Sequence, residues 1–165
     1  MDKLQKEFEN FLRKVQKYSL TISQDNLRKA FEFGRRVHEG QKRFSGDPIM
    51  SHSLESAKLL ATLNVDEETL IAALLQEVID YTDSTINDIE KNFGHAVAML
   101  VAGLKKIGTV RTSSKEDDIE TLRKMFIVMA KDLRVVLIKL ADRLHNMQTL
   151  EFVKQEKRKR IARET

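Results

Sequence analysis

Residues 132–150 read DLRVVLIKLADRLHNMQTL and form the most apolar helical pattern in the chain. Val135, Ile138 and Asp142 share one helical line, and leucines and valines occupy most of the neighbouring lines. A helix that is apolar on most of its sides belongs at the centre of a helical domain. The stretch therefore predicts a bundle built around a central apolar helix, which begins after Asp132 as its N-cap.

The composition of the whole chain favours an all-α fold. Six glycines and one proline among 165 residues fall well below the roughly 12% of average chains, which leaves little material for the turns of a many-stranded sheet. Apolar residues recur at spacings of three and four along most of the chain. We expect roughly eight to ten helices in one domain over residues 1–165, with an amphipathic first helix at about 2–17 and a basic last helix at about 153–165.

Several classes of protein are excluded by the same composition. The longest uninterrupted apolar run has seven residues, 96–102, whereas a membrane span needs about 20, and the charged start is unlike a secretory signal. We therefore expect a cytoplasmic protein with no membrane partner. Because the chain has no cysteine, disulfides and thiolate metal sites are excluded, and any metal must bind histidine, carboxylate or amide groups.

The formal net charge of +4 resides entirely in the last twelve residues, 154–165. Such a basic end can bind the phosphates of nucleic acid, but a solvated final helix carries the same pattern more often. The segment also lacks the interleaved aromatic residues that stack on bases. We therefore rank a nucleic-acid-binding helical module below the functions that the rest of the chain suggests.

Residues 40–48, GQKRFSGDP, contain two of the six glycines and the only proline, and they form the clearest loop of the sequence. His52 follows this basic loop at the start of a helix, where it could face the central helices and serve as a ligand. His38, His95 and His145 look less well placed. Because a lone histidine is more often a core or capping residue than a ligand, the role of His52 depends on its neighbours.

Polar residues also interrupt the apolar face of LIAALLQEVID, residues 70–80. We expect Glu77 to extend the apolar line of one helix that continues through Val78, with Gln76 and Asp80 beside it. A buried carboxylate without a partner costs several kcal/mol or takes a raised pKa. The sequence therefore demands a cation, a metal ion or a hydrogen-bond network, and a structural salt bridge is an equally good explanation.

Asp142 interrupts the predicted central helix in the same way. An intrahelical ion pair with Lys139 or Arg143 at the helix surface would explain it. Exposed pairs of this kind typically stabilise a helix by about 0.3–0.5 kcal/mol. Burial of Asp142 would exclude that explanation.

Four segments together carry a family resemblance: HEGQKRFSGDPIMSH at 38–52, AALLQEVIDYT at 72–82, FG at 93–94 and RKMFIVMAKDLRVVLIKLADRLHNMQTL at 123–150. They resemble the HD hydrolase domain of the RelA/SpoT family over residues 31–165. That family makes and destroys guanosine tetra- and pentaphosphate, and its HD domain removes the 3′-pyrophosphate with a bound manganese ion. The resemblance implies an HD-domain helical bundle, a manganese cofactor, and guanosine tetraphosphate or a related guanine nucleotide as the partner.

The resemblance also implies a set of metal ligands. Where the family has a histidine, a His–Asp pair and an aspartate, this chain has His52, Gln76, Glu77 and Asp142. The imidazole of the pair is lost at Gln76, whose neutral amide is a poor ligand for a transition metal. We therefore expect His52, Glu77 and Asp142 to bind manganese weakly or not at all.

The family's acidic pair, which orients or deprotonates the attacking water, corresponds to Asp80 and Tyr81. Asp80 keeps a carboxylate and, with Glu77, is the catalytic candidate, whereas a phenol with a pKa of about 10 is unsuited to accepting a proton at neutral pH. A planar guanidinium can stack on a base while it faces phosphate charge. The implied nucleotide contacts are Arg43, Ser45 and Asn146.

The resemblance leaves two interpretations besides the nucleic-acid module. We favour a catalytically impaired or inactive pyrophosphohydrolase domain that keeps a nucleotide-binding or regulatory role in the stringent response. The alternative is an active manganese-dependent hydrolase with a changed ligand set. We expect either a stand-alone protein or a piece of a longer parent chain that carries a synthetase domain.

Overall fold

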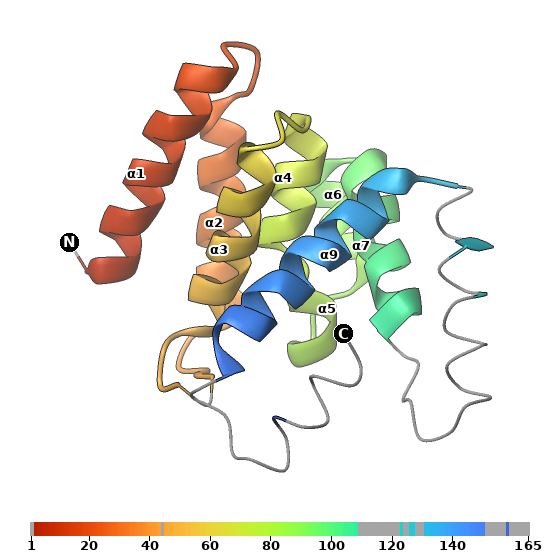
Figure 1. The fold of residues 1–165 in the computed structure, drawn as a ribbon. Coiled ribbons are helices and arrows are strands. Elements are labelled where there is room, and N and C mark those ends of the chain that lie inside the picture. The colour runs from red at the N-terminus through yellow and green to blue at the C-terminus, as the bar shows by residue number, and fades with distance from the viewer. Residues whose placement is uncertain are drawn as a thin grey trace.

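The structure is a computed structural model that describes residues 2–43, 45–108 and 131–150, together with Arg123, Phe126, Ile127 and Arg158. These residues form helices and connecting turns, with a single isolated β-bridge between Lys42 and Pro48 (Figure 1). The all-α prediction is confirmed. The helices are α1 (Lys3–Tyr18), α2 (Gln24–Val37), α3 (Ile49–Ala61), α4 (Glu67–Leu74), α5 (Val78–Tyr81), α6 (Ile86–Phe93), α7 (His95–Gly108) and α9 (Leu133–Gln148).

Polar side chains cap the starts of five of these helices, including α1, where the Asp2 side chain accepts from the Gln5 backbone N–H. The side chains of Ser23, Asp66, Thr85 and Asp132 each accept a hydrogen bond from a backbone N–H in the first turn of α2, α4, α6 and α9, respectively. Each cap satisfies a donor that would otherwise lack an intrahelical partner. The predicted basic helix at 153–165 lies outside the described residues, apart from Arg158.

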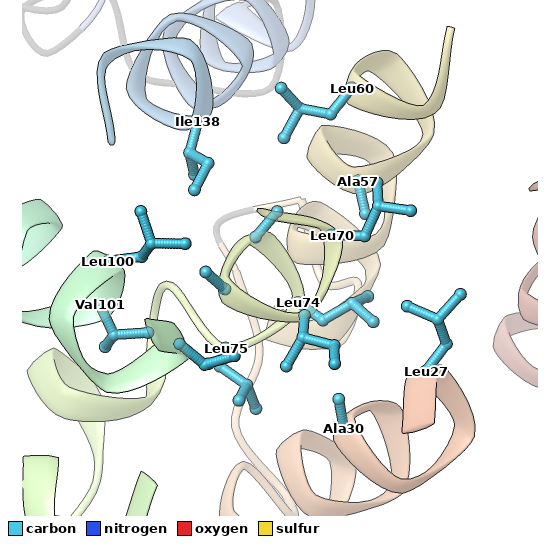
Figure 2. Packing of buried hydrophobic residues seen from close by; sticks show 14 of the residues in the cluster. Leu27, Ala30, Ala57, Leu60, Leu70, Leu74, Leu75, Leu100, Val101 and Ile138 are labelled. Atoms are coloured by element: carbon cyan, nitrogen blue, oxygen red, sulfur yellow. The ribbon is translucent and has the colours of Figure 1, made fainter. Parts of the chain in front are cut away.

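Helix α4 is the centre of the bundle. Its residues from Thr69 to Leu74 are all buried, and it packs against α2, α3, α7 and α9. Figure 2 shows the side chains that meet around it: Leu27 and Ala30 of α2, Ala57 and Leu60 of α3, Leu70 and Leu74 of α4, Leu100 and Val101 of α7, and Ile138 of α9. No described helix combines the length and apolar character needed to cross a bilayer.

The position of α9 differs from the sequence prediction. This helix lies across the bundle and packs on α3, α4 and α7 (Figure 1). Its buried line contains Val135, Ile138 and Asp142, but Leu133 and Leu140 on the opposite face are more than half exposed. The central apolar helix is therefore α4, and the outward leucines of α9 made its sequence look buried on more sides than it is.

The second difference lies at the end of α4. The sequence predicted a continuous helix through Val78, but α4 ends at Leu74 and α5 begins at Val78, so Gln76 and Glu77 lie in a turn. Backbone hydrogen bonds tighten there to a spacing of three residues, as in the bond from the Val78 N–H to the Leu75 carbonyl. The turn lets Leu75 and Val78 enter the core while Gln76 and Glu77 meet polar groups of α3.

Candidate metal centre

His52, Glu77 and Asp142 come together from three parts of the chain. His52 lies in the first turn of α3, and Asp142 lies on the buried line of α9, so the extensive packing of α3 on α9 brings them together. The His52 Nε2 atom is 2.8 Å from Asp142 Oδ1 and 3.6 Å from Glu77 Oε1. One ligand atom of each residue lies within 4.8 Å of the other two.

The carboxylate of Asp142 accepts three hydrogen bonds. Oδ1 accepts from His52 and, at 2.9 Å, from Asn146 Nδ2, while Oδ2 accepts from Lys139 Nζ at 2.7 Å. The pair with Lys139 was one of the two surface pairs that the sequence suggested, but Asp142 is only 4% exposed, so it is not a surface pair. Burial by itself would raise the pKa of Asp142, but hydrogen bonds and charges of His52 and Lys139 hold it well below its usual range.

His52 has a hydrogen-bond partner at each ring nitrogen. Nε2 faces Asp142, and Nδ1 lies 2.6 Å from the Nδ1 atom of His145. Burial lowers the pKa of His52, but hydrogen bonds with Asp142 and Glu77 outweigh it and raise the pKa overall. Burial, together with the nearby charge of His52, lowers the pKa of His145 to about 4. His145 is thus a neutral imidazole at neutral pH.

Sequence reasoning underrated His145. The signal was present, because His145 follows Asp142 by three residues on the same helical line of α9. His38 is also buried, and its Nδ1 atom lies 2.9 Å from Gln41 Oε1. His95 is exposed and pairs with Glu90.

Gln76 lies beside the cluster, but its side chain makes a different contact. Its Nε2 atom donates to Ser56 Oγ of α3 at 3.2 Å, and both residues are buried. The amide nitrogen is thereby tied to α3.

Asp80 and Tyr81 both lie on the short helix α5, on its exposed side. Partial burial of the Asp80 carboxyl, and then the charge of Glu77, raise its pKa. The charge of Glu77, and then burial, raise the pKa of the Tyr81 phenol. The phenol is therefore even less readily ionised than free tyrosine. The Tyr81 carbonyl accepts a hydrogen bond from Gln41 Nε2 at 2.9 Å, which ties α5 to the loop.

The predicted nucleotide contacts are only partly assembled. Arg43 Nη2 donates to Asn146 Oδ1 at 2.8 Å, and Asn146 in turn donates to Asp142. This chain of hydrogen bonds connects the loop to the cluster. Ser45 lies exposed on the same loop, where its Oγ atom accepts a 3.4 Å hydrogen bond from the Asp47 backbone.

Similarity to known proteins identifies the family of this chain. The HD domain family matches residues 30–165, which is most of the chain. The chain belongs to the HD domain family. Among curated HD-domain relatives, the bifunctional (p)ppGpp synthase/hydrolase SpoT of Escherichia coli K12 is 45% identical over 159 residues, covering 96% of this chain and 23% of that protein. The GTP pyrophosphokinase rsh of Brucella melitensis is 42% identical over 155 residues, covering 93% of this chain and 21% of that protein.

A solved HD-domain structure is also similar. The structure, described as "A metazoan ortholog of SpoT hydrolyzes ppGpp and plays a role in starvation responses", superposes with a TM-score of 0.68 at 28% identity, covering 85% of this chain and 81% of that one. The resemblance to the RelA/SpoT family is therefore confirmed. The chain spans about a quarter of the length of the curated relatives.

The residues present fit a divalent metal ion. One imidazole nitrogen and two carboxylate oxygens form a donor set that suits first-row metals such as manganese. Ligand atoms on one ion with bonds of about 2.1 Å lie about 3.0–3.4 Å apart when they are adjacent, so the limit of 4.8 Å on the mutual separations of these three atoms allows a set somewhat wider than a bound ion requires. A small movement of Glu77 would complete this part of the set.

Proposed function

We propose that this chain is a guanosine tetraphosphate 3′-pyrophosphohydrolase domain of the RelA/SpoT type that binds the nucleotide but hydrolyses it poorly. The names of its relatives support the substrate, since one is a (p)ppGpp synthase/hydrolase and another hydrolyzes ppGpp. The observation that carries the proposal is the convergence of His52, Glu77 and Asp142 from three elements onto one point.

In this proposal His52, Glu77 and Asp142 hold a manganese ion, which supplies Lewis acidity and a hydroxide at neutral pH when it is bound. Asp80 is the residue that accepts or orients a proton of the attacking water. Its raised pKa makes the carboxylate a stronger base than a free aspartate.

Two features of the site lower its affinity for the ion. Gln76 replaces an imidazole with a neutral amide, and the amide is engaged by Ser56. The second feature is Lys139, whose ammonium lies 2.7 Å from Asp142 Oδ2 and competes with a cation for that carboxylate. At Tyr81, in addition, a phenol stands where the family has a second carboxylate. We infer that binding of the ion and activation of water are both impaired.

The residues that would contact the nucleotide, Arg43, Ser45 and Asn146, are less affected by these departures. Arg43 is held at the cluster by Asn146, and in this proposal its planar guanidinium stacks on the guanine base. Ser45 lies on the same exposed loop and supplies a hydroxyl. We infer a nucleotide-binding or regulatory role, exerted in the cytoplasm and within a longer chain that also carries a synthetase domain.

A second candidate is an active hydrolase with a changed ligand set. It is favoured by the three donor atoms within 4.8 Å, because a ligand change often lowers metal affinity without abolishing the site. Glu77 and a water molecule would then compensate for the missing imidazole.

One pair of assays separates the candidates. Manganese-loaded protein is titrated with guanosine tetraphosphate by calorimetry, and pyrophosphate release is followed in parallel. We expect saturable binding with little release. Release at a rate ordinary for enzymes, at least about 1 s⁻¹, would favour the second candidate, and neither binding nor release would contradict both.

A further inference from the structure

The imidazole of His52 is held between two partners on α9. Asp142 lies at its Nε2 atom and His145 lies at its Nδ1 atom, and these partners are three residues apart on one helix. The His52 and His145 rings are tilted by 38° with centroids 4.9 Å apart. The short contact is therefore an in-line approach of two nitrogens, since stacked rings would be nearly parallel.

A hydrogen bond between two imidazole nitrogens needs one donor and one acceptor. His52 Nε2 faces the carboxylates of Glu77 and Asp142, so it is the nitrogen available to a metal ion. A metal-bound nitrogen must offer its lone pair, which leaves the proton of a neutral imidazole on Nδ1. His52 Nδ1 is then the donor, and His145 Nδ1 is the acceptor.

We propose that His145 is a positioning residue, which keeps the proton of His52 on Nδ1 and so directs the Nε2 lone pair to the metal ion. The inference rests on the proposed function, because it assigns a role toward the same site. Outer partners that fix the tautomer and the ring orientation of a ligating histidine typically contribute about 10- to 100-fold to metal affinity.

A purely structural role for His145 makes a different prediction. His145 lies in the last turn of α9, where a polar side chain can stabilise the helix end or simply fill space against His52. In that case any planar ring at this position would preserve metal binding. The acceptor nitrogen, rather than the ring, decides between the two roles.

The test compares His145→Phe, which keeps a ring but has no acceptor, with His145→Asn, whose Oδ1 atom replaces Nδ1 as an acceptor. His95→Phe is the matched control, because His95 is exposed and pairs with Glu90 on the surface. Affinities for Mn²⁺ and Zn²⁺ are measured by calorimetry without nucleotide. We expect a loss of about 10- to 100-fold for His145→Phe, and affinities close to wild type for His145→Asn and His95→Phe.

A second measurement locates the proton directly. Nitrogen-15 spectra of the histidine rings, recorded on the zinc-loaded protein, in which Nε2 no longer donates to Asp142, report which nitrogens carry protons and whether a coupling crosses the hydrogen bond. We expect a proton on His52 Nδ1 and a coupling to His145 Nδ1.

The outcomes separate the two proposals. If the wild-type protein binds neither metal ion, the proposed function fails and the role of His145 fails with it. If the wild type binds them, the variants and the spectra bear on His145 alone. The inference about His145 is overturned if His145→Phe, folded by circular dichroism, binds both metal ions as tightly as wild type. It is also overturned if the shared proton resides on His145.

Discussion

The two halves of the candidate metal centre are built on very different supports. His52 and Asp142 lie on helices of 13 and 16 residues that pack against each other and against the core, and both side chains are almost completely buried. Gln76 and Glu77 lie in a three-residue turn, and the four-residue helix α5 that follows presents Asp80 and Tyr81 on its exposed side.

The difference separates a half that is built into the packed core from a half that is carried by a short turn. Hydrogen bonds to His145, Lys139 and Asn146 surround the half formed by α3 and α9. The departures from the family's ligand and catalytic pattern that the resemblance implies all fall in the other half, within residues 76–81. We therefore expect the packed half to contribute to folding as well as to binding, and the turn half to affect mainly the chemistry.

Removal of the central carboxylate of the packed half should have the largest effect on stability. Asp142→Ala leaves buried His52 and the ammonium of Lys139 without their partner, at a cost of about 3–5 kcal/mol in the free energy of unfolding. Glu77→Ala, in the turn, should cost at most about 1 kcal/mol. Urea unfolding in the presence of a chelator measures both, and equal losses would contradict the contrast between the halves.

Repair of the turn half should raise activity without a comparable gain in stability. The double substitution Gln76→His and Glu77→Asp restores the family's ligand pair, and we expect pyrophosphate release from guanosine tetraphosphate to rise at least about 10-fold. An unchanged rate would mean that the ligands are not limiting. The further substitution Tyr81→Asp then tests whether the lost carboxylate of the acidic pair limits the rate instead.

The loop at residues 40–48, which Arg43 connects to the packed half, should control the affinity for the nucleotide. Arg43→Lys keeps the charge but loses the planar group that stacks on a base and reaches Asn146. We expect guanosine tetraphosphate affinity to fall by about 1 kcal/mol, which is roughly fivefold. Arg36→Lys, on the far side of α2 from the core, is the matched control. A calorimetric titration in which both variants bind like wild type would exclude Arg43 as a contact.

The smallest effect concerns the ion pairs of Arg134, which connect the starts of α4 and α9. Arg134 donates to Asp66 at 2.8 Å and to Asp132 at 2.7 Å. Burial raises the pKa of Asp66, but hydrogen bonds from Thr69 and Arg134 outweigh it and lower the pKa below 3.8. The hydrogen bond from Arg134 is the main cause of the lowered pKa of Asp132.

A carboxylate whose pKa is lower in the folded state stabilises the fold above its unfolded pKa, and this contribution is lost as the pH falls through the folded pKa. Arg134→Gln should therefore cost up to about 1 kcal/mol at neutral pH, and progressively less below about pH 4. Urea unfolding of both proteins across this range measures the difference. A constant difference would show that the carboxylates do not mediate the effect.

Much of the fold could be predicted from local signals. The capping residues Ser23, Asp66 and Asp132 and the scarcity of glycine and proline indicate where helices begin and that strands are few. The choice of central helix could not be predicted, because the outward leucines of α9 resemble core residues in a periodic pattern. Burial on four sides of α4 depends on packing that no short stretch encodes.

The site was predictable as a set of residues but not as a geometry. Resemblance identified His52, Glu77 and Asp142, and the structure places them together. The turn at residues 75–77 was missed, since LIAALLQEVID continues a helical pattern without a glycine or proline to mark its end. The contact of His145 with His52 was also missed, because it depends on how α3 crosses α9 and not on either sequence alone.

The most direct measurement is a calorimetric titration with Mn²⁺ of the wild-type chain beside the Gln76→His and Glu77→Asp double variant. We predict weak, single-site binding for the wild type and binding at least about 10-fold tighter for the variant. Equally tight single-site binding by both proteins would contradict the claim that the lost imidazole limits the site.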